Sequence, residues 1–534
     1  MSNPIINTEQ GKIKGKVTKS DSGFNYYMFK GIPYAKPPIG ELRFSAPQPP
    51  EPWEGVRDGT TDCNICAQFK KTTRTVVGDE DCLFLNVYTP KLPEPSSSLL
   101  SVMVFSHGGG FKDGDATDTA RHGPEFIIEK GVVLVTFNYR VGILGFLALD
   151  RKEAPGNMGM RDHVEALKWV KKNIINFGGD PNNVTIFGVS SGGAAVEYLL
   201  LSPMAQGLFQ KAISQSGSSL MHWAQNRNIK ELAYTIPTMK GITIADDEEL
   251  INYLKEMSIE ELVKASIDAI RSNKIKGRFN FGFVPTVENP TNWEPFLSKS
   301  TYQLLATGEF SKVPYMTGIC SREGLIMVIY GRTVLDRLIK ENNFLDYFPF
   351  KIDDTEKSEL EYRLIDIYTK QNATFSEPDA FAIDFFSDID FIGAVYTAAM
   401  FISKHNSPVY FYELAYECAL NYVKKSFNIN RKGVCHADDL GYLFKTEVYT
   451  DEISDIDKYV RDVILELWTN FAKYGDLIST KWEPIVSGSG TACFVINEAP
   501  YMKYEVYPIR AKLYEEIYDK KCGVTLSPRA DPRK

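Results

Sequence analysis

The sequence predicts an α/β protein built on a large, mostly parallel β-sheet with helices on both faces. Short apolar runs with the length of buried strands recur along the chain, and patterns of helical period follow several of them. Hydrophobic residues make up 43% and charged residues 24% of the 534 positions, which is enough apolar material for a large core. We find no fixed-period repeat and no low-complexity tract. We therefore expect one body, residues 1–534, with helical insertions over the sheet.

The first half of the predicted sheet comes from segments rich in turns. The first 90 residues read as short strands and turns, with Pro-rich stretches at 33–38 and 47–52. Two apolar runs follow at 83–88 and 102–105, and the segment between them is rich in Pro and Ser. Such a segment is typical of a surface loop, so we expect the two runs to be neighbouring strands.

Strands then alternate with helices. Three further elements are expected: a strand at 132–138, a helix from about 161 to 176 and a strand at 184–187. Segments 245–310 and 330–405 are richer in helical patterns and aromatic residues. No flexible linker sets them apart, so we interpret them as insertions rather than independent domains.

Charge and apolar patterning exclude two classes of partner. The chain has 60 Lys and Arg against 68 Asp and Glu, a formal net charge of −8. Nucleic acid and anionic membranes would on balance repel it. No uninterrupted apolar run reaches the roughly 18 residues of a membrane span. The first residues lack a signal-peptide pattern, and the last residues form neither a retention signal nor a lipid-anchor motif, so we expect a cytoplasmic protein.

The eight cysteines do not form a disulfide framework by number or spacing. Cys63 and Cys66 form a C-x-x-C pair, which could bind zinc or cycle between redox states. A zinc site needs a second ligand pair at suitable spacing, and only Cys82 follows. We therefore expect no metal.

A nucleophile motif stands between a strand-like and a helix-like run. Residues 188–192 read GVSSG and fit G-x-S-x-G. A sharp strand-to-helix turn strains the backbone at the serine and demands small neighbours, which Gly188 and Gly192 provide. Ser190 is then the candidate nucleophile. An ordinary tight turn between strand and helix is the alternative that this pentad alone leaves open.

A glycine-rich motif, HGGGF at 107–111, follows the strand-like run 102–105. Three consecutive glycines leave backbone N–H groups uncovered, and those of Gly109 and Gly110, with that of Ser191, would form an oxyanion hole. A flexible loop or a phosphate cradle is the alternative interpretation. Neither G-x-x-x-x-G-K-[ST] nor G-x-G-x-x-G is present, so nucleotide binding is disfavoured.

A serine nucleophile needs a base and an orienting acid, which follow it in chain order in proteins with this pentad. Of the histidines that lie well downstream, His405 lies in a polar turn and His436 lies in a loop that leads into an apolar segment. Glu323 follows the strand-like run 313–317, which would place it at the end of a strand, on the same edge of the sheet as Ser190. Spacing alone does not separate Glu323 from a solvated glutamate, or His436 from a structural histidine.

The whole set of motifs resembles the type-B carboxylesterase/lipase family, which includes carboxylesterases and cholinesterases. Within it the chain is most similar to insect α-esterase-type carboxylesterases. The landmarks are FKGIPYAKPPIGELRF at 29–44, EDCLFLNVY at 80–88, HGGGF at 107–111, FNYRVGILGFL at 137–147, GNMGMRDHVEALKWVKKNI at 156–174, FGGDPNNVTIFGVSSGG at 177–193, SQSGS at 214–218 and GVCHADDL at 433–440.

The resemblance implies the α/β-hydrolase fold, with helical insertions over the active site, and an activity that requires no cofactor. It assigns the catalytic roles as follows: Ser190 nucleophile, Glu323 acid, His436 general base, and Gly109, Gly110 and Ser191 oxyanion-hole donors. It also implies a structural ion pair between Arg43 and Glu80 and a disulfide between Cys66 and Cys82.

Three departures from the family pattern bear on specificity. Val189 stands where many members carry Glu and where juvenile hormone esterases carry Gln, which removes an acid beside the nucleophile. Ser191 replaces the usual Ala but keeps its N–H. The stretch from Cys66 to Cys82 contains no Trp, whereas cholinesterases place their choline-binding Trp there, so we do not expect acetylcholinesterase activity.

The expected function is hydrolysis of neutral, fairly hydrophobic carboxylic esters through a Ser-His-Glu triad and an acyl-enzyme. Dietary or xenobiotic esters are the expected substrates. Organophosphates are expected as covalent inhibitors that the protein sequesters, because a phosphoryl group resembles the acylation intermediate. The alternatives are a hormone- or pheromone-degrading esterase and a catalytically silent binding protein. The sequence gives no oligomeric state.

Overall fold

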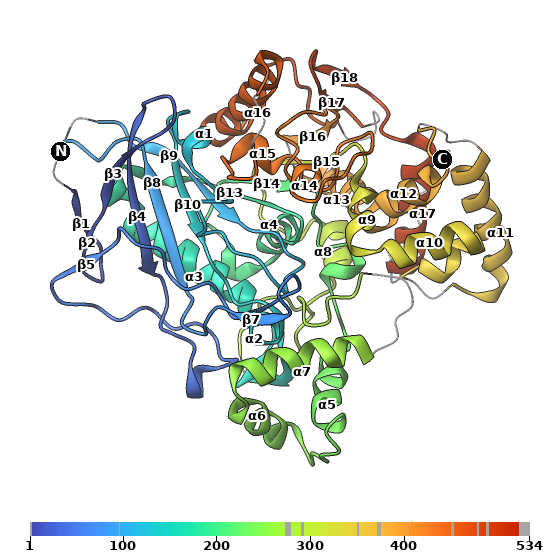
Figure 1. The fold of residues 1–534 in the computed structure, drawn as a ribbon, viewed down its shortest axis with the longest axis horizontal. Helices are drawn as coiled ribbons and strands as arrows, with labels where there is room; N and C mark the ends of the chain where they lie inside the picture. Colours follow the sequence, from blue (N-terminus) through green and yellow to red (C-terminus); the bar gives the residue numbers. More distant parts are fainter. Residues whose placement is uncertain are drawn as a thin grey trace.

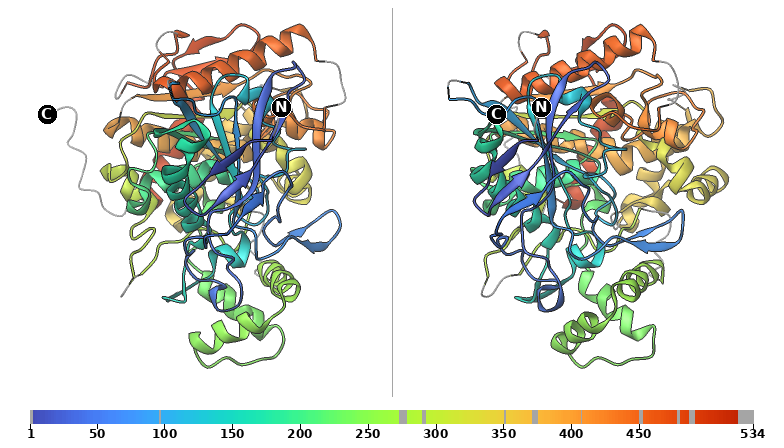
Figure 2. Two further views of the ribbon diagram at one scale, coloured as in Figure 1. Left: turned by 90° about the vertical axis from the view of Figure 1, so that its left-hand side faces the viewer. Right: turned by 60° about the vertical axis from the view of Figure 1, so that its left-hand side comes forward.

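An 11-stranded sheet runs through the molecule, and helices pack on both of its faces (Figures 1 and 2). The computed structural model describes residues 3–95, 97–272, 279–289, 293–349, 352–370, 375–406, 408–449, 453–477, 480–486 and 491–522. In sheet order the strands are β18 (Tyr501–Lys503), β17 (Cys493–Ile496), β16 (Val409–Leu414), β15 (Tyr315–Cys320), β14 (Lys211–Gln215), β13 (Gly179–Val189), β9 (Leu100–Ser106), β10 (Val133–Phe137), β8 (Phe84–Thr89), β4 (Asn25–Pro33) and β3 (Lys16–Lys19).

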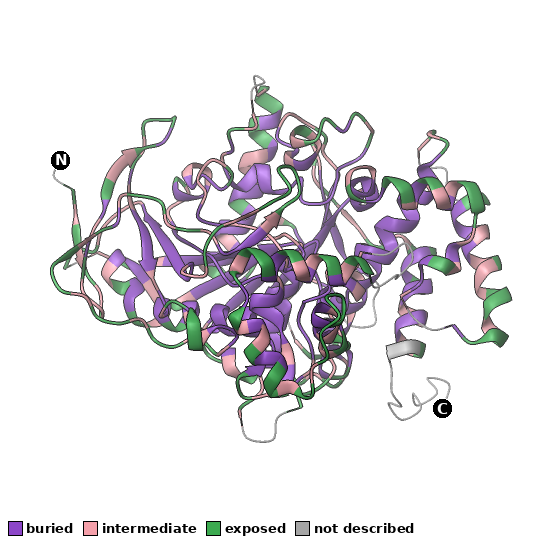
Figure 3. Cartoon of the chain, turned by 60° about the horizontal axis from the view of Figure 1, so that its bottom comes forward, coloured by how far each residue is buried: buried purple, intermediate pink, exposed green. Residues whose placement is uncertain are grey.

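The sheet is parallel in its central part and antiparallel at both margins. Neighbouring strands from β10 through β9 and β13 to β17 pair in parallel. β8, β4 and β3 continue it in antiparallel pairing, and β18 does so at the opposite margin. Every residue of β8, β10, β14, β15 and β16 is buried, as a sheet covered on both faces requires (Figure 3). The predicted α/β-hydrolase fold is confirmed.

Smaller strands and the helices complete the chain. The short strands are β1 (Ile5–Asn7), β2 (Lys12–Lys14), β5 (Val56–Asp58), β6 (Gln68–Lys70), β7 (Thr75–Val77), β11 (Ala148–Arg151) and β12 (Ala154–Pro155). The helices up to the nucleophile are α1 (Glu125–Ile128), α2 (Gly142–Phe146), α3 (Met158–Asn173) and α4 (Ser191–Leu201). Those that follow are α5 (Ile229–Thr238), α6 (Asp247–Glu256), α7 (Ile259–Ser272), α8 (Thr301–Thr307), α9 (Met327–Tyr330), α10 (Arg332–Glu341), α11 (Asp354–Ile365), α12 (Ala380–Ser387), α13 (Gly393–His405), α14 (Tyr422–Ser426), α15 (Leu440–Leu443), α16 (Asp455–Tyr474) and α17 (Pro508–Cys522).

One expectation about strand order is wrong. The runs at 83–88 and 102–105 form β8 and β9, but β10 lies between them in the sheet. β10 pairs in parallel with β9 and antiparallel with β8. All residues of β10 are buried, which suits a strand inside the sheet. The Pro- and Ser-rich segment therefore connects two strands, β8 and β9, that are separated by β10.

The two helix-rich segments form separate groups of helices around the sheet. The first contains α6 to α8, and α5 to α7 project at the bottom of Figure 1. The second contains α10 to α13, of which α10 and α11 lie at the right of that view. The helix expected at 161–176 begins at Met158 and ends as an α-helix at Asn173, where a 3₁₀ turn continues to Phe177.

One helical run has the length and composition of a membrane-spanning helix. Among the described residues, the continuous run Ala380–His405 is long and apolar enough, and the sequence reading missed it because three aspartates interrupt the segment. However, 89% of its apolar 18-residue stretch is buried inside the molecule. Burial of this extent is the property of a core helix, which accounts for its composition.

The register of three neighbouring strands positions the site. Val189, the last residue of β13, pairs with Gln215 at the end of β14, and Gln215 pairs with Gly318 of β15. The residues that leave these strands therefore emerge side by side at one edge of the sheet. They include Ser190 and Glu323.

Candidate active site

Ser190 occupies a strained turn between β13 and α4. Its φ of 59° and ψ of −122° lie outside the regions that serine ordinarily adopts. The Ser190 N–H donates to the Gln215 carbonyl at 2.8 Å, which ties the turn to the next strand. A Cβ on Gly192 would overlap the carbonyl oxygen of Ser106, so the close packing of β9 under the turn requires glycine there. This strained turn holds the serine at the first turn of α4.

Glu323 and His436, which are 113 residues apart in the chain, meet through a hydrogen bond of 2.6 Å between Oε2 and Nδ1. The other carboxylate oxygen, Oε1, accepts from Ser216 Oγ at 2.5 Å and from the Cys320 N–H at 2.7 Å. Glu323 is fully buried. Both of its oxygens are thus satisfied, and the carboxylate fixes the orientation of the imidazole ring.

The loop that carries His436 is tied to the loop that carries Glu323. The Arg322 N–H donates to the Val434 carbonyl at 2.9 Å, and the Val434 N–H donates to Ser321 Oγ at 3.1 Å. Within the His436 loop, the Asp438 carboxylate accepts from the Cys435 N–H at 2.7 Å. These contacts fix the separation of acid and base through backbone groups.

A cavity of about 480 Å³ brings several of the predicted residues together. Ser190, His436, Gly109 and Gly110 all line it. Four aromatic side chains also line it: Trp223 and Phe391, which are buried, and Phe279 and Phe281, which are half-buried. Glu323 lies behind His436 rather than in the cavity wall, and Ser191 is buried as the first residue of α4. The site can therefore enclose an apolar ligand group beside Ser190.

The glycine-rich loop turns sharply along the cavity wall. Gly109 has a φ of 120°, and a Cβ there would overlap the Asp113 carbonyl oxygen. In the described part of the chain, the N–H groups of Gly109 and Gly110 donate to no protein acceptor. Unpaired N–H groups in the wall of a cavity can bind an oxyanion. Tyr139 Oη supports the loop by donating to the His107 carbonyl at 3.0 Å.

Two further histidines line the cavity, and both favour the neutral form. Burial lowers the pKa of His107, whose Nδ1 also hydrogen-bonds the Gly108 carbonyl at 2.7 Å. Burial lowers the pKa of His122 to about 3. Neither is hydrogen-bonded to a carboxylate as His436 is. His405, the alternative to His436 in the sequence, lies at the end of α13 and hydrogen-bonds the Ala306 carbonyl at 3.1 Å.

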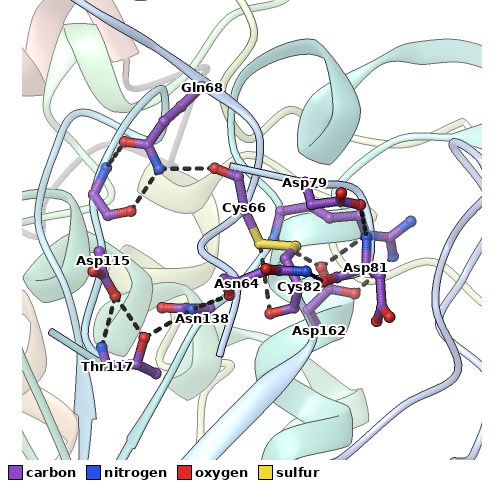
Figure 4. Close-up of a disulfide and its surroundings, with 12 residues drawn as sticks. Asn64, Cys66, Gln68, Asp79, Asp81, Cys82, Asp115, Thr117, Asn138 and Asp162 are labelled. Carbon is purple, nitrogen blue, oxygen red and sulfur yellow. Dashed lines mark hydrogen bonds and ion pairs between the residues drawn. A yellow bond between two sulfur atoms is a disulfide. The ribbon is translucent and has the colours of Figure 1, made fainter. Parts of the chain in front are cut away.

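The structure also tests the pairs that the sequence suggested. Cys66 is disulfide-bonded to Cys82 and so is not available to a C-x-x-C metal site (Figure 4). Among the described residues, no group of His, Cys, Asp and Glu has the arrangement of a metal site. The ion pair between Arg43 and Glu80 is confirmed, with Arg43 Nε 2.7 Å from Glu80 Oε1.

Sequence reasoning missed two side chains that position the candidate groups. Ser216 donates to Glu323. Gln68, which Figure 4 shows beside the disulfide, exchanges two hydrogen bonds of 2.8 Å with the backbone of Gly114, just beyond the glycine-rich loop. Ser216 belongs to the SQSGS motif at 214–218, which was noted as a landmark without a role. Its φ of 50° marks an unusual turn that the sequence does not reveal.

A mostly parallel sheet with a serine on a strained strand-to-helix turn, and a carboxylate-bound histidine across the same cavity, defines a serine hydrolase of the α/β-hydrolase fold. The comparisons with known proteins give the particular family. The chain belongs to the Carboxylesterase family, whose profile matches residues 2–513. It is a carboxylic ester hydrolase.

Two curated insect relatives and one solved structure are similar over most of the chain. Juvenile hormone esterase of Tribolium castaneum is 36% identical over 89% of this chain and 84% of the relative. Esterase FE4 of Myzus persicae is 33% identical over 88% of this chain and 84% of the relative. The crystal structure of juvenile hormone esterase from Manduca sexta, with OTFP covalently attached, has a TM-score of 0.84, 29% identity and coverage of 97% of this chain and 100% of that chain.

Proposed function

We propose that the protein hydrolyses neutral, fairly hydrophobic carboxylic esters through Ser190, His436 and Glu323. One observation carries this proposal: Ser190 and His436 line the same aromatic-walled cavity, and His436 is held from behind by the buried Glu323. Buried, apolar walls favour substrates whose reacting end carries no charge. Dietary and xenobiotic esters fit this description.

In the first half-reaction, His436 accepts the Ser190 proton as Ser190 Oγ attacks the ester carbonyl carbon. The N–H groups of Gly109, Gly110 and Ser191 stabilise the negative charge on the carbonyl oxygen. The bond from carbon to the alcohol oxygen breaks, His436 returns the proton to that oxygen, and an acyl-enzyme remains. Glu323 orients the ring and stabilises the imidazolium, so it takes no proton.

In the second half-reaction, water replaces the alcohol. His436 removes a proton from water, whose oxygen attacks the acyl carbon, and the bond to Ser190 Oγ breaks as that oxygen regains the proton. With an organophosphate, Ser190 Oγ would attack phosphorus in the first half-reaction, the bond from phosphorus to the leaving group would break, and His436 would pass the serine proton to that group. Because its tetrahedral phosphoryl group already resembles the acylation intermediate, the adduct would be retained and the inhibitor sequestered.

The test uses a chromogenic short-chain aryl ester and then an equimolar organophosphate, with turnover and intact mass recorded together. We expect turnover to stop as one phosphoryl adduct appears on Ser190. Ser190→Ala should lower kcat by about 10⁴-fold or more and take no adduct, while the circular dichroism spectrum stays native. Turnover retained by Ser190→Ala, or a folded native protein with neither turnover nor adduct, would contradict the proposal. The second result would favour a silent binding protein.

A hormone-degrading esterase is the second candidate. The similarity to two insect juvenile hormone esterases favours it. Val189 departs from the Gln that this group carries beside the nucleophile. Measuring kcat/KM for a juvenile hormone against a simple aryl ester decides between them. A preference for the hormone would replace the xenobiotic assignment, whereas a preference for the aryl ester would support it.

A further inference from the structure

The mouth of the cavity is positively charged, although the protein as a whole is acidic. Among the described residues that line the cavity, four carry a positive charge and two carry a negative charge. The cations are Lys71, Lys112, Arg121 and Arg271, and the carboxylates are Asp113 and Asp115. Three of these cations (Lys71, Arg121 and Arg271) are exposed, as is the lining residue Tyr330, and these four residues define the cavity mouth. The chain carries a formal net charge of −8, so this excess of positive charge is local.

Lys71 differs from the other cations in its pairing. Three of the four have acidic partners: Lys112 contacts Asp113, Arg121 lies 3.6 Å from Asp118, and Arg271 lies 3.5 Å from Asp268. Lys71 forms no ion pair with any residue that the structure describes. Its Nζ instead lies 4.9 Å from the centre of the Tyr330 ring. An aromatic face attracts the ammonium group but leaves its charge uncompensated.

The surroundings of Lys71 add to this positive potential. Partial burial lowers the pKa of Lys71, and the charges of Lys112 and Arg271 lower it further, while Asp113 opposes them. These neighbouring cations disfavour the ammonium form of Lys71, and a bound anion would offset their effect on its pKa. The positive charge at the mouth is therefore incompletely compensated, which favours binding of an anion there.

The position of Lys71 is fixed by the structure beneath it. Lys71 follows β6 at the tip of the β6–β7 hairpin, which lies inside the loop closed by the Cys66–Cys82 disulfide. Gln68, in the same strand, is bonded to Gly114 and to the Cys66 carbonyl, as Figure 4 shows. Arg271 of α7 lies over the Phe69 ring at 5.8 Å, which joins the hairpin to that helix.

We propose that the cavity mouth, through Lys71, binds an anionic group at the far end of the substrate, so that the preferred substrates are hydrophobic esters with a terminal carboxylate or a similar anion. This inference rests on the proposed ester hydrolysis and refines its substrate class: the reacting end is uncharged, as proposed, and only the far end carries a charge. The reacting ester stays in the apolar inner cavity, and the anion remains unchanged at the mouth. The arm that carries it can be the acyl or the alcohol part.

The experiment compares matched esters that differ only in terminal charge. Mono-p-nitrophenyl esters of dicarboxylic acids of increasing length carry the anion on the acyl arm, and their methyl-capped diesters are neutral at that end. For the best chain length, we expect native kcat/KM to be about tenfold higher for the anionic ester. The preference should fall as salt is added. Acetates of ω-carboxyalkyl phenols test the alcohol arm in the same way, and a preference on either arm supports the proposal.

Substitutions locate the effect. Lys71→Glu should reduce the anionic-to-neutral ratio to about one or below, and Lys71→Arg should retain it. Lys264→Glu is the matched control, because Lys264 lies on α7 with Arg271 but is exposed, paired with Glu260 and outside the cavity lining. An unchanged ratio in Lys71→Glu would overturn the inference. So would equal kcat/KM of the native protein for the anionic and the neutral ester on both the acyl and the alcohol arm. Failure of the native protein to hydrolyse the neutral ester would instead contradict the proposed function.

Discussion

The inner end of the cavity and its mouth are built in different ways. At the inner end, buried groups are joined by hydrogen bonds of 2.5 to 2.7 Å around Glu323. Ser216 and Glu323 follow strands β14 and β15 of the sheet, and His436 lies in the loop between α14 and α15. At the mouth, exposed cations lie 3.5 Å or more from acidic partners and 4.9 to 5.8 Å from aromatic rings. Lys71 lies on a hairpin, Arg271 on helix α7 and Arg121 in the loop between β9 and α1, all of them outside the 11-stranded sheet.

In the proposed function, this difference assigns the chemistry to the inner end and the substrate selectivity to the mouth. Groups that follow neighbouring buried strands cannot move without disturbing the sheet, so their mutual geometry is preserved. Groups on surface hairpins and helices contribute small, solvent-screened energies and tolerate substitution. Changes at the inner end should therefore alter rate by orders of magnitude, whereas changes at the mouth should alter selectivity by smaller factors.

The largest effect after loss of the serine itself is expected at Glu323. In Glu323→Gln the side chain keeps its size, but an amide group facing His436 Nδ1 disfavours the tautomer that can accept a proton from Ser190. We expect kcat to fall by about 10³- to 10⁴-fold for neutral and anionic esters alike, measured by steady-state kinetics. Glu94→Gln, in an exposed loop, is the control. A loss of less than about tenfold would show that the inner end does not depend on this carboxylate.

A second buried carboxylate sharpens the comparison because it lies on α4, the helix that follows Ser190, without lining the cavity. Glu197 of α4 is fully buried, and its Oε1 accepts from Ser218 Oγ, the Ser219 N–H and Ser219 Oγ. Burial raises its pKa to about 7, and these hydrogen bonds oppose the shift. The folded protein therefore retains a proton that the unfolded chain releases nearer 4.5. Native stability should fall as pH rises between these two values.

Glu197→Gln removes that pH dependence while keeping an oxygen acceptor for the three donors. Relative to the native protein, the variant should gain about 2 kcal/mol in free energy of unfolding between about pH 5 and about pH 8. Urea unfolding at the two pH values measures the difference. Glu359→Gln, on the exposed surface of α11, should show no such gain. Equal differences at both pH values would mean that Glu197 is ionised in the folded protein at low cost.

The sequence predicts the fold and the candidate nucleophile more readily than the contacts that complete the site. The apolar runs identify β8, β9, β10 and β13 because a sheet buried on both faces needs such runs. They do not give strand order, which is why β10 was not placed between β8 and β9. The G-x-S-x-G pentad points to Ser190 through local backbone strain, a property of adjacent residues.

The acid and its supports depend on distant pairing. Glu323 is one of 68 acidic residues, and only the resemblance to a family singled it out. Its contact with Ser216 joins residues 107 positions apart, and that of Gln68 with Gly114 joins residues 46 positions apart. Such pairs follow from the register of β14 against β15 and from the disulfide loop. Neither leaves a periodic signal in the sequence.

The smallest effect is expected at Gln68, where the two regions are joined. Its side chain exchanges two hydrogen bonds with Gly114, next to the glycine-rich loop of the inner end, while its strand leads to Lys71 at the mouth. In Gln68→Ala, the loss of these bonds should loosen the loop by about 1 kcal/mol, so that kcat falls about fivefold with little change in KM. Gln303→Ala, on the exposed surface of α8, is the matched control.

Reduction of the Cys66–Cys82 disulfide should act through the same contact, because the disulfide closes the loop that presents Gln68. We expect dithiothreitol to lower native kcat by a similar factor and to have little further effect on Gln68→Ala, since both changes release one clamp. If the two effects multiply instead, the hairpin and the glycine-rich loop respond independently. The mouth could then change its selectivity without any cost to the rate at the inner end, and the separation of chemistry from specificity would be complete.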